Sequence, residues 1–101
     1  PAKGFKYKRI LTRNMEAGPV DTILLELKKG ARRTQMIKTD AFEYKYIIKG
    51  RVEYQIEETK YILEEGDSLF FDGRLSHKPA NIGNEDALML VIYFFLTRNK
   101  D

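Results

Sequence analysis

Short hydrophobic stretches alternate with turn-forming residues along most of the chain. The stretches are rich in branched and aromatic side chains, and they predict strands at 5–12, 20–28, 33–38, 42–49, 51–57, 59–63, 67–71, 76–80 and 86–96. Glycines at positions 30, 50, 66 and 83 lie between these stretches, where a turn favours a residue that tolerates unusual backbone angles. Many short strands separated by turns indicate an all-β sandwich or barrel.

The middle of the chain contains a strict alternation of apolar and polar residues. Val52, Tyr54 and Ile56 alternate with polar side chains, which predicts a strand with one buried face. Together with the preceding stretch, 46–49, this strand has the pattern of a β-hairpin that turns at Gly50.

The last hydrophobic run, 87–96, is apolar at every position. A strand of this kind needs cover on both faces, one from the barrel interior and the other from a second layer or a partner subunit. We therefore expect a homodimer, since symmetric dimers are the commonest oligomers.

Composition narrows the class of protein. A chain of 101 residues can bury one modest core, so we expect a single domain over 1–101. The absence of cysteine excludes disulfide scaffolds, zinc ribbons and thiol chemistry, and it fits the reducing cytoplasm. The longest apolar run is ten residues, whereas a membrane-spanning helix needs about 20. We expect no membrane span, and no signal peptide because charges are scattered through the N-terminal residues.

Charge is unevenly distributed along the chain. Residues 1–39 contain ten basic and three acidic side chains, while residues 40–101 contain eight basic and twelve acidic ones. A nucleic-acid-binding face combines basic residues with base-stacking aromatics on one surface. That combination is limited to residues 3–9, which fit a strand entry better, so we interpret the excess charge as a solvated basic edge.

Two segments resemble the motifs of the cupin family, a group of small jelly-roll barrels. The first family motif is Gly, five residues, His-x-His, three or four residues, Glu, six residues and Gly. In this chain Gly30 is followed at the same spacings by Met36-Ile37-Lys38, Glu43 and Gly50.

The second family motif is Gly, five residues, Pro-x-Gly, two residues, His, three residues and Asn. Here Gly66 is followed at the same spacings by Asp72-Gly73-Arg74, His77 and Asn81. The resemblance, over residues 30–50 and 66–81, implies that the all-β chain is a cupin-type jelly-roll barrel.

The first motif departs from the family pattern where a metal would bind. Metal-dependent cupins hold their ion with both histidines and the glutamate of the first motif and the histidine of the second. Met36 and Lys38 replace the first two, so Glu43 and His77 would be the only ligands if a metal binds. Two ligands beside an ammonium group make a poor cation site, so we expect no metal or other cofactor.

The same resemblance implies a set of interior residues. Family geometry directs Glu43, Met36 and Lys38 into the barrel, and strand alternation places Lys45 on the same face as Glu43. A buried carboxylate needs a partner, and we expect Lys38 to be its counter-ion. The predicted ligand pocket consists of Met36, Lys38, Glu43, Lys45, Phe71 and His77. We assign no catalytic residue.

A narrower resemblance concerns function. Residues 6–31 and 66–85 are similar to the cupin domain that follows a helix-turn-helix in XRE-type bacterial transcriptional regulators. This implies a non-catalytic sensing domain whose small, partly anionic ligand contacts Lys38 and His77. DNA would be bound only through a helix-turn-helix, which these 101 residues do not contain.

Two alternatives stay open. A free-standing, isomerase-like cupin enzyme could use His77 and Glu43, with or without a divalent metal. A structural barrel would simply have its interior filled. Fold alone does not separate these functions, because the scaffold hosts many activities.

Overall fold

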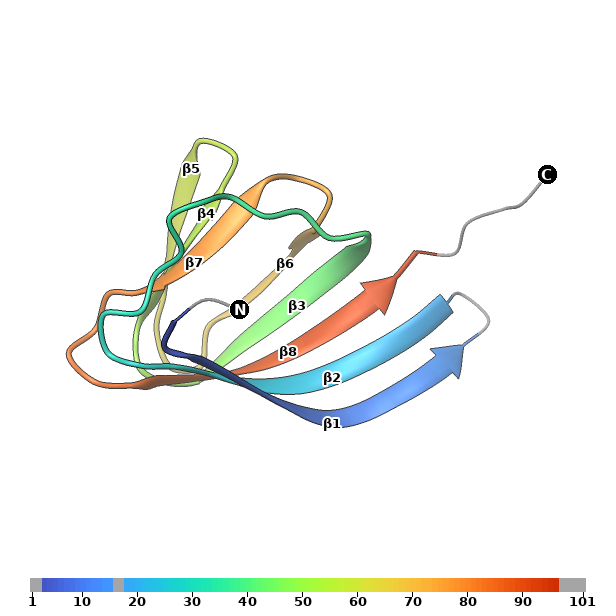
Figure 1. The fold of residues 1–101 in the computed structure, drawn as a ribbon, viewed down its shortest axis with the longest axis horizontal. Coiled ribbons are helices and arrows are strands. Elements are labelled where there is room, and N and C mark those ends of the chain that lie inside the picture. The colour runs from blue at the N-terminus through green and yellow to red at the C-terminus, as the bar shows by residue number, and fades with distance from the viewer. Residues whose placement is uncertain (1–2, 16–17, 97–101) are drawn as a thin grey trace.

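The chain forms two antiparallel β-sheets that face each other (Figure 1). The computed structural model describes residues 3–15 and 18–96, and for 11–15 and 18 the backbone alone. The strands are β1 (Phe5–Met15), β2 (Gly18–Leu27), β3 (Ala41–Lys49), β4 (Val52–Ile56), β5 (Thr59–Leu63), β6 (Ser68–Asp72), β7 (His77–Asn81) and β8 (Ala87–Phe95). No helix that could span a membrane is found among the described residues.

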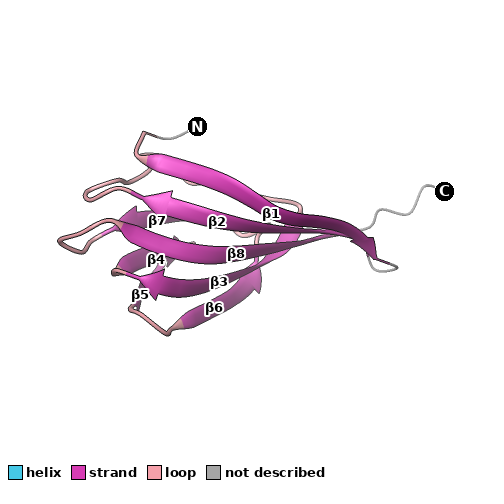
Figure 2. Ribbon diagram, turned by 90° about the horizontal axis from the view of Figure 1, so that it is seen from below, coloured by secondary structure: helices cyan, strands magenta, loops and turns pink. Residues whose placement is uncertain are grey.

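The larger sheet has the order β1-β2-β8-β3-β6 and the smaller one β5-β4-β7. Figure 2 shows the strands of the larger sheet side by side, with the smaller sheet behind them. Over residues 3–15 and 18–96 the sheets do not join into a closed barrel. The predicted all-β fold is confirmed, as two facing sheets in an open form.

Strand alternation decides which side chains form the core between the sheets. Val52, Tyr54 and Ile56 of β4 are buried while the residues between them are partly exposed, as the sequence predicted. On β8, Met89 and Val91 are buried, and the intervening residues face the outside of the larger sheet, where they are only partly covered. Each sheet therefore contributes one apolar face to a shared core.

The strand predicted at 33–38 is absent. The segment between β2 and β3 instead runs alongside β7 (Figure 1), and it pairs there only through two isolated bridges, Arg32 with Ala80 and Ile37 with His77. Two β-branched residues, Thr34 and Ile37, are not sufficient for a strand when the neighbouring backbone is met at only two points.

The predicted hairpin at Gly50 is also wrong, because β3 and β4 belong to different sheets. Gly50 has a φ of +94°, and a Cβ atom built there would lie 2.8 Å from the Cα of Ala87. The glycine therefore lets the chain cross between sheets at a close backbone contact, rather than reverse within one sheet.

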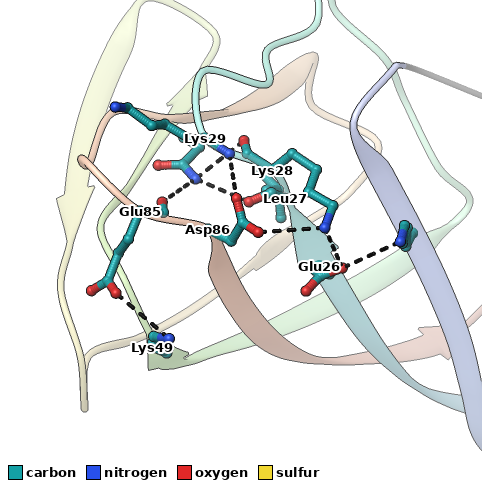
Figure 3. Close-up of polar contacts among 9 residues, drawn as sticks. Glu26, Leu27, Lys28, Lys29, Lys49, Glu85 and Asp86 are labelled. Carbon is teal, nitrogen blue, oxygen red and sulfur yellow. Dashed lines mark hydrogen bonds and ion pairs between the residues drawn. The ribbon is translucent and has the colours of Figure 1, made fainter.

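A network of polar contacts fixes the loop between β7 and β8 to the end of β2 (Figure 3). The buried side-chain amide of Asn81 donates to the carbonyl oxygens of Leu27, Lys28 and Glu85, and its oxygen accepts from the backbone N–H of Gly83. The motif residue Asn81 is thus a structural clamp between the two sheets.

Candidate functional site

The interior contains an ion pair between Glu43 and Lys45. Both residues lie on β3 two positions apart, so their side chains point to the same side of the sheet. The Nζ atom of Lys45 is 2.7 Å from Oε1 of Glu43, and the two side chains are only 3% and 1% exposed. This contact is therefore a buried, charge-assisted hydrogen bond.

His77 approaches the same carboxylate from the opposite sheet. Its Nε2 atom is 3.2 Å from Oε2 of Glu43, and its Nδ1 atom is 2.8 Å from the carbonyl oxygen of Leu75. Because that carbonyl can only accept, Nδ1 is the donor. Both ring nitrogens are thus engaged, Nδ1 by Leu75 and Nε2 by Glu43. The ring of Phe71 on β6 packs edge-on against the imidazole at 4.8 Å.

The loop residues Thr39 and Gly73 complete the surroundings of the carboxylate. The hydroxyl of Thr39 donates to Oε2 of Glu43 at 2.6 Å. A Cβ atom built on Gly73 would collide with the Thr39 hydroxyl and lie 2.8 Å from Glu43 Oε2. Gly73 therefore leaves the space that Thr39 and Glu43 use, and any larger residue would push them away.

Two tyrosine rings flank the ammonium group of Lys45. Its Nζ atom lies 5.3 Å from the ring centre of Tyr54 on β4 and 5.2 Å from that of Tyr93 on β8. These are cation–π distances, so the ring faces share in stabilising the buried charge. Burial raises the pKa of Tyr54 and raises that of Tyr93 to about 12, so both phenols are neutral near pH 7.

The electrostatics of the cluster keep Glu43 ionised. Burial alone would raise the pKa of its carboxyl group. The hydrogen bond from His77, the positive charge and hydrogen bond of Lys45 and the hydrogen bond from Thr39 outweigh burial and lower the pKa from 4.5 to about 2. Among the described residues, every buried side-chain polar atom has a hydrogen-bond partner. The cluster is therefore internally satisfied.

The structure corrects one part of the predicted pocket. Glu43, Lys45, Phe71 and His77 lie together in the interior, but Lys38 is exposed and is not the counter-ion of Glu43. Lys45 has that role. The reason is that 33–38 is not a strand, so the alternation assumed for it does not apply. Met36, on the same segment, is half-buried.

Sequence analysis missed Thr39, Tyr54, Tyr93 and Gly73 as members of the cluster. A signal existed for Tyr93, which continues the inward alternation of Met89 and Val91 on β8. No comparable signal existed for Thr39, because it lies in a loop whose path depends on contacts with Gly73.

The donor set does not fit a divalent cation. The two candidate ligands, Glu43 and His77, are bonded to each other, and the ammonium group of Lys45 lies against the carboxylate that would have to coordinate. Among the described residues no three histidine, aspartate or glutamate side chains converge as a cation site would require. The positive charge in the interior comes from the protein itself.

Comparison with known proteins agrees with this architecture. The model of the cupin domain family matches residues 23–93. The search among curated proteins finds no match. Among solved structures, the cupin domain of an XRE family transcriptional regulator from Enterobacter cloacae has 18% identity and a TM-score of 0.81. The alignment covers 94% of this chain and 100% of that one.

Two further structures are similar at the level of the fold. An HTH_3 family transcriptional regulator from Vibrio cholerae has 18% identity and a TM-score of 0.80, covering 93% of this chain and 52% of that one. The cupin domain of Cnp3 from Schizosaccharomyces pombe has 13% identity and a TM-score of 0.80, covering 92% and 66%. This chain thus spans about half of the Vibrio regulator. The family match covers most of the chain, and on that ground the chain belongs to the cupin domain family.

Proposed function

We propose that this protein is a non-catalytic sensing domain that binds a small, partly anionic ligand in the interior between its sheets. The observation that carries the proposal is the buried ion pair between Glu43 and Lys45. A buried ion pair adds little net stability compared with well-packed apolar side chains. A charged interior is therefore better explained by a ligand that uses those charges.

The geometry of His77 favours binding over catalysis. A general base needs a free nitrogen within reach of its substrate. Both nitrogens of His77 are engaged, by Leu75 and Glu43, and its side chain is only 2% exposed. The isomerase-like alternative would require Nε2 to leave Glu43 and then to accept a proton from a substrate that reaches this buried position.

Ligand binding in this interior is coupled to a change in structure. An anionic ligand competes with Glu43 for the ammonium of Lys45 on β3 and for the imidazole of His77 on β7. These strands belong to opposite sheets, so exchanging their bonds changes how the sheets pack. A ligand that prefers one packing shifts the population toward it, which is the requirement for a sensor.

The regulatory role rests on similarity and is part of the same proposal. The Enterobacter and Vibrio structures are described as transcriptional regulators, and this chain resembles the fold of their cupin domains. We propose that the domain serves a helix-turn-helix regulator and acts as a homodimer. Sequencing the gene upstream tests this: a reading frame encoding several short helices supports it, and an unrelated reading frame contradicts it.

NMR of the imidazole group tests ligand binding directly. His77 is the only histidine, so its ring signals need no assignment. The ¹⁵N-labelled protein is mixed with a panel of small carboxylates and keto acids. The proposal expects a compound that shifts both ring signals and is not itself converted. Turnover of a compound favours the enzyme, and ring signals unchanged by the whole panel favour a structural barrel.

A further inference from the structure

Seven basic side chains of the described residues are paired with carboxylates. The pairs involve Lys6, Arg9, Lys28, Lys45, Lys49, Arg51 and Arg74, and those of Lys28 and Lys49 are visible in Figure 3. Arg32, Lys60 and Lys78 are among the described cations that have no described carboxylate within ion-pair distance. Arg33 donates to the hydroxyl of Tyr7 instead.

These cations lie together on the outside of the smaller sheet. Lys60 on β5 and Lys78 on β7 are both register partners of Gln55 on the central strand β4. Two strand spacings separate them, about 10 Å between Cα atoms. The inward side chains of β4 are buried, so Gln55 and its register partners Lys60 and Lys78 face outward. Arg32 bridges to Ala80, beside the same strand β7.

The cations surround a small pocket. Arg32, Arg33, Lys60 and Lys78, with Glu53 and Gln55, line a hollow of about 90 Å³, the share of about three liquid water molecules. Glu53 is the single carboxylate of this lining. Four cations against one anion leave the hollow strongly positive, and like charges held this close repel one another unless an anion lies between them.

We propose that this pocket binds one phosphate-class oxyanion, either inorganic phosphate or the terminal phosphate of a small phosphoester. Ammonium and guanidinium groups are the preferred partners of such oxygens, and a guanidinium can use two N–H groups at once. The small volume suits a single tetrahedral group. The pocket lies outside the sheet, so the proposal is independent of the ligand proposed for the interior.

An NMR titration with inorganic phosphate at constant ionic strength tests this inference. We expect saturable shifts of the backbone amides of Arg32, Lys60 and Lys78. The substitution Lys78→Gln should weaken binding about fivefold, the upper end of the loss expected for one exposed ion pair. The matched control is Lys8→Gln, which removes the same charge from an exposed lysine on β1 and should leave binding unchanged.

Three results would overturn the proposal. Shifts that do not saturate indicate general screening by salt rather than a site. Equal weakening by Lys78→Gln and Lys8→Gln indicates that net charge alone attracts the anion. Binding of a short DNA duplex without any binding of phosphate or a phosphomonoester assigns the surface to an extended backbone rather than to a single-phosphate pocket.

Discussion

Lys45 and Glu43 occupy alternate positions of β3 and face the same interior, where each neutralises the other. In metal-dependent cupins the corresponding region is expected to hold a cation bound by histidines. Here the cation is covalently part of the chain, flanked by Tyr54 and Tyr93. The interior charge is therefore balanced as soon as the domain folds.

Replacing Lys45 should lower the free energy of unfolding strongly, whereas replacing Lys38 should leave it nearly unchanged. Lys45→Met leaves the Glu43 carboxylate buried without its ammonium partner, and we expect a loss of about 3–5 kcal/mol in unfolding free energy. Lys38→Met removes an exposed charge and should change stability by less than about 0.5 kcal/mol. Urea denaturation of both variants measures the difference.

The double variant Glu43→Gln/Lys45→Met provides the control for this prediction. Removing both charges should recover part of the stability lost in Lys45→Met, because no unpaired carboxylate remains buried. Equal losses for Lys38→Met and Lys45→Met would contradict the assignment of the ion pair.

Low pH should lower the free energy of unfolding of the domain, because it protonates Glu43. Its pKa is about 2 in the folded chain and 4.5 ordinarily, so its stabilisation is fully present above pH 4.5 and is lost as the pH falls toward 2. The contribution is on the order of 3 kcal/mol. Asp72 and Asp86 also have lowered pKa values, because of hydrogen bonds from Arg74 and from the backbone of Lys29, respectively.

Comparison of wild type with Glu43→Gln separates these carboxylates. Asp72 and Asp86 are present in both proteins, so the difference in slope of unfolding free energy against pH reports Glu43. We expect the wild type to lose more stability between pH 4.5 and 2 than the variant. Parallel curves for the two proteins would show that Glu43 is not held in its ionised form by the fold.

At the scale of elements, the Asn81 clamp joins the end of β2 to the loop that follows β7. Asn81→Asp replaces an amide donor with a carboxylate that faces three carbonyl oxygens. We expect a loss of about 3 kcal/mol or more, since the new charge is buried without a partner. Asn84→Asp, at an exposed position of the same loop, is the matched control. Equal thermal unfolding temperatures for the two variants would show that Asn81 does not hold the end of β2 to the loop after β7.

The sequence predicted correctly those features of the strands that depend on neighbouring residues. It failed for features that depend on contacts with distant strands. Alternation of Val52, Tyr54 and Ile56 gave the buried face of β4 correctly, because that face depends only on period two. The partners of β4 are not local, and the hairpin predicted at Gly50 failed because the chain crosses to the other sheet. Register between distant strands depends on packing that no single stretch encodes.

The residues of the candidate site were likewise predicted where a local pattern placed them, and missed where their position depends on the path of a loop. The spacing of the second motif located His77, and alternation located Lys45 beside Glu43. The choice of Lys38 as counter-ion depended on a strand that does not form, so it failed. Thr39 could not have been predicted, because its hydroxyl reaches Glu43 only through the path of a loop.

At the scale of the whole molecule, the outer face of the larger sheet is apolar and aromatic. Phe70 is 61% exposed, and its ring lies 5.8 Å from that of Phe42 and 6.2 Å from that of Phe94. Strand pairing continues this face to Leu90 and Leu24. A contiguous apolar surface of this kind marks an interaction site, and a symmetric dimer would cover the same face on both copies.

Sedimentation velocity tests whether this face is the dimer interface. We expect Phe70→Ser to weaken the dimer at least about tenfold, because a buried aromatic anchor contributes more than about 1.4 kcal/mol. Ile62→Ser removes an exposed apolar side chain from the other sheet and should leave the dimer unchanged. A wild-type protein that sediments only as a monomer would contradict the proposed assembly.

Native mass spectrometry in the presence of zinc and manganese ions, followed by exchange into metal-free buffer, tests directly whether Lys45 takes the place of a bound ion in the interior. Because Lys45 already neutralises Glu43, we predict a mass equal to that of the polypeptide, with no retained ion. The Glu43→Gln variant is measured beside it. One ion retained per wild-type chain and lost in Glu43→Gln would show instead that Glu43 is a metal ligand and that Lys45 does not replace the ion.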